Sequence, residues 1–243
     1  MQDQDNHDRL RASYSNVARK TWLHEDLQTG NLEVSRDLFT PESMARGSPR
    51  PKDLEVVALL AGLPFGADVC GPLRAIQEEL SGVIGDALHY WVEPDNLGIE
   101  FCVFKWPDEP WYEEYRAIIE AAINDAQATA FRLAIGGVQI NPDGCVVACG
   151  YDPDGVFFSV REQMKAALPF LPKRQSGWAH IPVGRILEPV GKERFAALSK
   201  LAEHLVDTPV VETMIDSIKL IRETRWYMEE RTVMMERVLE RGA

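Results

Sequence analysis

Two separated stretches decide how this chain folds: YWVEPDNLGIEFCVF at residues 90–104 and WAHIPVGRI at residues 178–186. In the second part of each stretch, apolar residues alternate with small or polar residues, which is the period of a β-strand. A segment with helical spacing of apolar residues follows each one, over 110–128 and 191–206. The repeated order predicts two similar halves related by an internal duplication.

The sequence around these stretches predicts the remaining elements. In the first half we expect a buried strand at 54–64, a helix at 68–84 and a hairpin of strands at 88–93 and 97–106. In the second half we expect strands at 131–140, 145–151 and 178–187, with a helix at 155–168. A last strand is expected at 214–226. The charged segment after it either extends the strand pair or forms a terminal helix.

These elements indicate the α/β (α+β) class, with two pseudo-symmetric sheet-plus-helix lobes around a central cleft. We expect one bilobal domain at 53–243, with lobes at about 53–128, completed by a C-terminal strand, and at 129–206. Residues 1–52 are more polar and end in the turn-rich RGSPRPKD. They predict an N-terminal arm with one amphipathic helix, which packs on the domain or on a protein partner.

Charge and composition exclude several classes of protein. Acidic residues outnumber basic ones by 38 to 26, giving a net charge of −12, and no basic block occurs. A protein that binds long nucleic acids needs a basic stripe, so we expect none here, although a short nucleotide still fits a locally positive cleft. No apolar run is long enough to span a membrane, and the N-terminus lacks the apolar core of a signal peptide. We therefore expect a soluble cytoplasmic protein without a membrane partner.

Metal and cofactor sites are also not expected. The cysteines form no CxxC pair, and neither they nor the histidines outside the second stretch have metal-ligand spacing: Cys70, Cys102, Cys145, Cys149, His7, His24, His89 and His204. The chain has no GxGxxG after a strand and no GxxxxGK[ST]. The cysteines are expected to be small buried side chains in a reducing compartment.

The two stretches resemble the motifs of the 2H phosphoesterase superfamily, which contains 2′-5′ RNA ligase-like proteins and cyclic phosphodiesterases. In that superfamily each lobe carries His-hydrophobic-Thr/Ser-hydrophobic, and the first motif follows a phrase similar to WVEPDNL at 91–97. The second motif resembles His180-Ile-Pro-Val-Gly-Arg185. The opening strand, VVALLAGLP at 56–64, is also similar, and the resemblance covers about residues 54–222.

The resemblance implies a two-histidine mechanism from which this chain departs. In active relatives one histidine acts as general base and the other as general acid on a phosphodiester, and two hydroxyls bind the phosphate oxygens. Here Gly98, Glu100 and Pro182 stand at three of the four positions, and only His180 remains. Losing one acid/base partner costs about 10²–10⁴-fold in rate. We therefore expect the usual reaction to be lost or altered.

Strand alternation predicts which side chains face the cleft. From the first motif strand these are Gly98, Glu100 and Cys102, and from the second His180, Pro182 and Gly184. Arg185 supplies positive charge at the rim or is merely solvated, and Tyr90 is a flanking aromatic residue that packs in the core or contacts a ligand. A sharper hypothesis makes His180 and Glu100 the catalytic pair, with the carboxylate orienting the imidazole and raising its pKa.

Three functions stay open at this level. The first is a diverged protein that binds a small molecule or short nucleotide in the cleft, or uses altered acid/base chemistry at Glu100 and His180. The second is an active 2′,3′-cyclic phosphodiesterase or RNA-end-processing hydrolase. The third is a noncatalytic regulatory or structural subunit that recruits a partner through residues 1–52.

Overall fold

The strands form two separate sheets in the computed structural model, which describes residues 2–23 and 25–241. The first sheet has the order β3-β1-β8-β9, with antiparallel neighbours throughout. Its strands are β1 (Asp53–Gly62), β3 (Gly98–Lys105), β8 (Ser217–Arg225) and β9 (Glu230–Val238). The near-continuous apolar runs of β1 and β3 show that these two strands are buried on both faces of the sheet.

The second sheet has the order β10-β4-β5-β6-β2, and β7 also pairs with β4. Its strands are β2 (His89–Trp91), β4 (Thr129–Ile140), β5 (Cys145–Tyr151), β6 (Ala179–Ile186), β7 (Val211–Ile215) and β10 (Glu240–Arg241). Only the short β10–β4 pair is parallel among these described strands. The motif strand β6 therefore belongs to this sheet, whereas the motif strand β3 belongs to the other.

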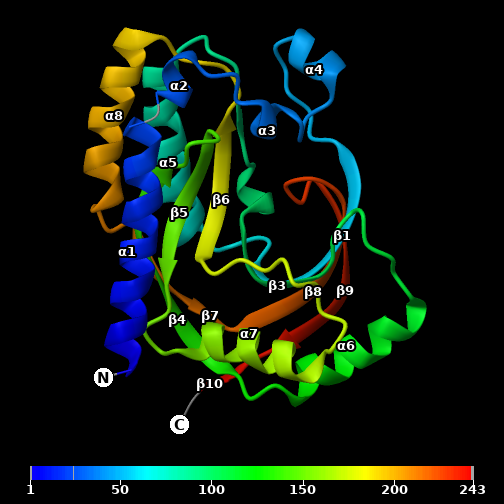
Figure 1. Ribbon diagram of the computed structural model, residues 1–243. Helices are drawn as coiled ribbons and strands as arrows, with labels where there is room; N and C mark the ends of the chain where they lie inside the picture. Colours follow the sequence, from blue (N-terminus) through cyan, green and yellow to red (C-terminus); the bar gives the residue numbers. More distant parts are fainter. Residues whose placement is uncertain (1, 24, 242–243) are drawn as a thin grey trace.

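Amphipathic helices cover the outer faces of the sheets, as Figure 1 shows for α5 and α8 beside the second sheet. The long helices are α1 (Gln2–Leu23), α5 (Ala67–Ile84), α6 (Glu113–Asp125), α7 (Val156–Ala167) and α8 (Lys192–Val206). Three short helices follow α1: α2 (Asp26–Thr29), α3 (Glu33–Arg36) and α4 (Pro41–Ala45). The observed class is therefore the predicted mixed α/β fold.

The predicted hairpin at 88–93 and 97–106 is wrong. β2 pairs with β6, and β3 pairs with β1, so the two strands lie in different sheets. Between them Pro94–Asn96 forms a 3₁₀ helix with Pro94 at its first position, instead of a tight hairpin turn. The short polar connection between two apolar runs looked like a hairpin, but it carries the chain from one lobe to the other.

The single strand predicted at 214–226 is two strands. β7 ends at Ile215 and pairs with β4, whereas β8 begins at Ser217 and pairs with β1 and β9. The apolar alternation continues across Asp216, so periodicity alone does not reveal that the chain changes sheets. Of the two possibilities for the C-terminal segment, the strand is confirmed, because β9 forms a hairpin with β8.

The N-terminal arm contains the expected helix and packs on the rest of the chain. The Tyr14 hydroxyl donates to the backbone oxygens of Ala179 and Gly150, at 2.8 and 3.3 Å. The ring of Tyr14 contacts Cys149, which is the cross-strand partner of His180, so α1 lies on the face of the second sheet that carries His180. Further along, Leu27, Leu32, Phe39 and Met44 join the main core. The domain boundary at residue 52 stays a prediction, because the arm shares the core of the domain.

Replacing Tyr14 by Phe tests this docking. The variant leaves the ring in place but removes the hydroxyl from two buried backbone oxygens, so we expect a loss of roughly 1–2 kcal/mol in the free energy of unfolding. Urea denaturation measures it. Tyr112→Phe is the matched control, because Tyr112 is exposed, and it is expected to change nothing. Equal stability of the two variants would contradict the docked arm.

Candidate functional site: a cavity between the two motif strands

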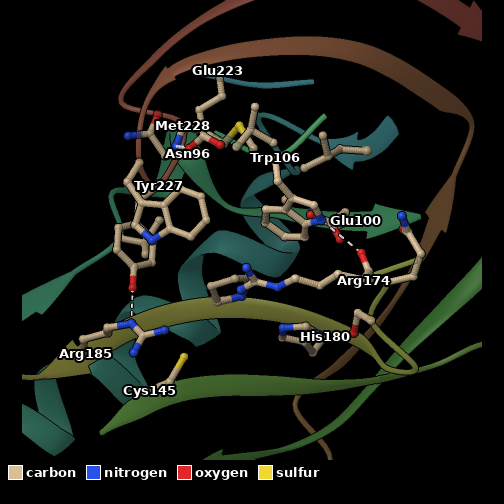
Figure 2. Close-up of a pocket in the computed structure, with 18 residues that line it drawn as sticks. Asn96, Glu100, Trp106, Cys145, Arg174, His180, Arg185, Glu223, Tyr227 and Met228 are labelled. Carbon is tan, nitrogen blue, oxygen red and sulfur yellow. Dashed lines mark hydrogen bonds between the residues drawn. The ribbon is translucent and has the colours of Figure 1, made fainter. Parts of the chain in front are cut away.

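A cavity of about 350 Å³ lies between the two sheets, in the predicted cleft. One side is formed by β1, β3, β8 and the β8–β9 turn, and the other by β5 and β6. Figure 2 shows Glu100 and His180 pointing into this space from different ribbons. Of the residues predicted to face the cleft, the structure places Gly98, Glu100, His180, Pro182 and Arg185 on the cavity wall.

Cys102 does not face the cleft as predicted. In the pairing of β1 with β3, Leu60 lies opposite Glu100 but Leu59 lies opposite Cys102, so Phe101 is an extra residue on β3. Such a bulge reverses the alternation beyond it. Cys102 therefore packs into the main core, and Val103 takes the cleft side.

Gly184 also lies away from the cavity, for the same reason. In the pairing of β5 with β6, Val147 lies opposite Pro182 and Val146 opposite Gly184, which leaves Val183 as the extra residue. A Cβ atom at Gly184 would lie 2.2 Å from the Trp91 ring, so this glycine permits a close approach of β2 and does not contact a ligand. The bulge turns Arg185 into the cavity.

Tyr90 lies on the cleft side but behind the cavity wall. Its ring packs against Phe39 and Tyr227, with centroids 5.1 and 5.0 Å apart, and its hydroxyl donates to Glu229 Oε1 at 2.8 Å. Burial and the neighbouring Glu229 raise the pKa of the Tyr90 hydroxyl. Tyr90 therefore supports Tyr227, which does line the cavity.

Arg161, a buried residue of α7, holds the two motif strands together. Its Nε donates to Phe101 O at 2.6 Å, and its Nη2 donates to Glu100 O at 3.0 Å and to Trp178 O at 2.9 Å. These bonds connect β3 to the segment that enters β6. The sequence did not indicate a role for Arg161, because an arginine within an amphipathic helix looks like a solvated side chain.

The imidazole of His180 is held in its neutral form. Burial lowers its pKa to about 4, and the positive charge of Arg161 acts in the same direction. The hypothesis that Glu100 raises the pKa of His180 is therefore wrong, although both side chains line one cavity. A histidine with this pKa accepts a proton at neutral pH only weakly and carries none to donate.

Two carboxyl groups face the cavity, and burial makes both hard to ionise. Desolvation raises the pKa of Glu100 to about 7, against the opposing effect of Arg161 and Arg174. Desolvation, with a contribution from Glu100, raises the pKa of Glu223 to about 8. The sequence did not indicate a role for Glu223, because its strand carries no motif.

Two arginines line the cavity in different states. Arg185 donates through Nη1 to Asp143 Oδ2 at 2.8 Å and also binds the hydroxyls of Ser35 and Tyr227. Its charge is therefore already compensated, and of the two possibilities for Arg185 the solvated position is wrong, because its side chain is largely buried. Arg174 is exposed, and its guanidinium carbon lies 4.4 Å from the centre of the Trp106 ring.

The loop that carries Arg174 is fastened to β3. Gln175 accepts a hydrogen bond from Val103 N at 3.0 Å and donates one to Val103 O at 2.8 Å, so its amide acts as a strand partner at this edge. Trp106 Nε1 donates to Arg174 O at 3.0 Å. This loop forms one wall of the cavity, and no sequence pattern had indicated it.

Other kinds of site find no support in the described part of the chain. No group of three or more His, Cys, Asp or Glu side chains there is arranged to hold a metal ion. No helix among the described residues is long and apolar enough to cross a membrane. His24 lies outside the described residues.

Comparison with solved structures identifies the fold. TT0787 of Thermus thermophilus is 16% identical, with a TM-score of 0.57, and the match covers 77% of this chain and 100% of that one. E. coli LigT complexed with 3′-AMP is 12% identical, with a TM-score of 0.53, covering 77% of this chain and 99% of LigT. A structure described as a phosphoesterase is 13% identical, with a TM-score of 0.53, and the match covers 78% of this chain and 100% of that one.

No protein-family model and no curated protein matches this chain by sequence. The three solved structures nevertheless align over 99–100% of their own length, with TM-scores of 0.53 to 0.57, which shows a shared fold. The chain therefore has a LigT-like fold, with the expected cleft between its two lobes.

Proposed function

We propose that this chain binds a small molecule in the cavity between its two sheets and does not perform the two-histidine cleavage of phosphodiesters. One observation carries the proposal. Across the cavity from His180, strand β3 presents Gly98 and the carboxyl group of Glu100, and Glu223 adds a second carboxyl. Among the described residues that line the cavity, His180 is the only histidine.

The acid/base requirement argues against the usual reaction. That reaction needs one imidazole that accepts a proton and one imidazolium that donates a proton. Gly98 has no group for either role, and the pKa of His180, at about 4, keeps its imidazole neutral at physiological pH. Glu100, with a pKa of about 7, is the nearest substitute for an acid. It stands at the position where relatives are expected to bind phosphate through a hydroxyl.

The wall of the cavity also disfavours a phosphate group. Pro182 offers neither a hydroxyl nor a backbone N–H, and an ionised carboxylate at Glu100 or Glu223 repels an anion. Arg185 is already bound to Asp143. The mainly apolar lining and a volume of about 350 Å³ suit a small organic ligand.

The second candidate is an active cyclic phosphodiesterase, which the retention of His180 in the cavity favours. The third candidate, a regulatory subunit, would use residues 1–52 for a partner, and the docking of Tyr14 and Phe39 on the chain's own domain weighs against it.

The described cysteines are free thiols, which fits the cytoplasmic location that we propose.

Turnover of a nucleoside 2′,3′-cyclic phosphate separates the first two candidates. We expect the wild-type protein to release no nucleoside monophosphate above the uncatalysed rate, and His180→Ala to behave identically, because the acid partner is missing. Chromatography of the reaction mixture measures the product. Turnover that disappears in His180→Ala would establish the phosphodiesterase.

A cavity-filling variant tests ligand binding directly. We expect some members of a metabolite panel to raise the melting temperature of the wild-type protein, since a ligand that binds only the folded state stabilises it. Pro182→Phe, which places a ring in the cavity, should abolish these shifts. Pro153→Phe is the control at an exposed position. Shifts that persist in Pro182→Phe, or a panel without any shift, would contradict a ligand site in the cavity.

The buried carboxyl of Glu223 predicts a pH-dependent stability. Between pH 4.5 and about 8 the folded protein keeps a proton on Glu223 that the unfolded chain has lost, so stability falls as the pH rises through this window. In Glu223→Gln the uncharged amide replaces the protonated carboxyl and does not ionise at any of these pH values. Its free energy of unfolding relative to wild type should therefore increase by at least ~1 kcal/mol from pH 5 to pH 9.

Urea denaturation at the two pH values measures this difference. Glu203→Gln, at an exposed position on α8, is the control and should show no such trend. A constant difference between Glu223→Gln and wild type would mean that Glu223 ionises normally in the folded protein.

A further inference from the structure

We propose that the ligand of this cavity is an organic cation: a protonated amine, a guanidine or a quaternary ammonium compound. Its charge would lie between the carboxyl groups of Glu100 and Glu223 and against the rings of Trp106, Trp226 and Tyr227. This inference rests on the proposed function and names its ligand class.

The two carboxyl groups have unused acceptor capacity that faces the cavity. Glu223 is only 3% exposed and lines the cavity, and its Oε1 accepts a hydrogen bond from Met228 N at 2.7 Å. Among the described residues, no other group donates to this carboxyl, and none donates to the carboxyl of Glu100. These free acceptor positions face the cavity, where a cationic N–H group could donate to them or an ammonium could pack against them.

The aromatic wall supplies the second half of a cation site. The rings of Trp106, Trp226 and Tyr227 line the same cavity as the carboxyls. The faces of such rings attract cations, and tryptophan attracts them most strongly. The guanidinium of Arg174 already lies 4.4 Å from the centre of the Trp106 ring, and Figure 2 shows this side chain reaching across the cavity below that ring.

Arg174 therefore marks where a ligand cation binds. Its side chain is exposed and comes from the loop after α7. Within the described part of the chain it forms no ion pair with either carboxyl, although its charge lowers the pKa of Glu100. A ligand with the same charge can take its place over Trp106 while Arg174 turns into solvent. Unlike the Arg174 side chain, which pairs with neither carboxyl, a small ligand can contact Glu100 and Glu223 together.

The other cations near the cavity do not neutralise these carboxyls. Arg185 is paired with Asp143 and bound by Ser35 and Tyr227. Arg161 lies behind the wall, where three backbone oxygens occupy two of its nitrogens. Arg231 donates to Asn96 and to backbone oxygens. Among the described residues, neither carboxyl thus has an ion-pair partner, although the charges of Arg161 and Arg174 lower the pKa of Glu100 and that of Arg231 lowers the pKa of Glu223.

The turn that presents Tyr227 and Met228 is held in an unfavourable backbone conformation. Both residues have positive φ angles, 65° and 58°, which non-glycine residues seldom adopt. The hydrogen bond from Met228 N to Glu223 fastens this turn at the cavity. Strained residues that tertiary structure holds in place are concentrated at binding sites, which agrees with a ligand role for this turn.

The protonation of Glu100 and Glu223 determines how the affinity for a cation changes with pH. The pKa values of Glu100 and Glu223 are about 7 and about 8, so both carboxyls are largely protonated at pH 6 and ionised at pH 9. A cation binds the ionised forms, so its affinity should rise between these pH values. An anion bound by Arg174 would show the opposite trend.

Isothermal titration calorimetry with choline and with its neutral isostere 3,3-dimethylbutan-1-ol tests the charge requirement, and agmatine serves as a guanidine probe. We expect choline or agmatine to bind at least about tenfold more tightly than the neutral alcohol, and more tightly at pH 9 than at pH 6. Glu223→Gln should weaken cation binding by roughly tenfold or more, whereas Glu203→Gln should leave it unchanged. A ligand-dependent change in tryptophan fluorescence that is lost in Trp106→Phe locates the ligand at Trp106.

Other outcomes would overturn the inference. If neither cation binds at millimolar concentration, or the neutral alcohol binds equally well, the cation assignment is wrong. The same holds if inorganic phosphate or AMP binds instead and weakens as the pH rises. In those cases the cavity could still be a ligand site. Increases in melting temperature that metabolites cause in the wild-type protein but not in Pro182→Phe would support it, so the two proposals fail separately.

Discussion

The guanidinium of Arg161 is the contact on which the geometry of the cleft depends. The two motif strands belong to different sheets, and no ladder of backbone hydrogen bonds joins β3 to β6 among the described strands. Arg161 supplies the missing connection through the backbone oxygens of Glu100, Phe101 and Trp178. The same buried charge lowers the pKa of His180 and opposes the rise in the pKa of Glu100. One side chain thus fixes the shape of the site and influences its electrostatics.

Two bulges then decide which side chains the cleft receives. Phe101 on β3 sends Cys102 into the core, and Val183 on β6 brings Arg185 to the cavity in place of Gly184. Together with the carboxyl of Glu223 from β8, these shifts create a cavity that differs from the motif pattern. Two acids and three aromatic rings surround one neutral imidazole, where the resemblance implies two imidazoles and two hydroxyls.

The sequence predicted the fold class, the long helices, the cleft and the positions of Gly98, Glu100, His180 and Pro182, because strand and helix periods are local properties. It failed where the outcome depends on tertiary pairing. At Pro94–Asn96 and at Asp216 the chain passes from one sheet to the other, and the periodicity of the sequence does not show either passage. Single-residue bulges do not appear in the periodicity either. Glu223 and Tyr227 reach the cavity only because the β8–β9 hairpin closes there, which no motif indicates.

The neutral state of His180 separates a binding cavity from a two-histidine catalyst. An NMR titration of the His180 ring, assigned by its loss in His180→Ala, measures this most directly. We expect a pKa of about 4, at which the imidazole stays neutral throughout the physiological range. A measured pKa at or above about 6.5, the ordinary value for histidine, would give an imidazole that can donate a proton near neutral pH and would contradict the account.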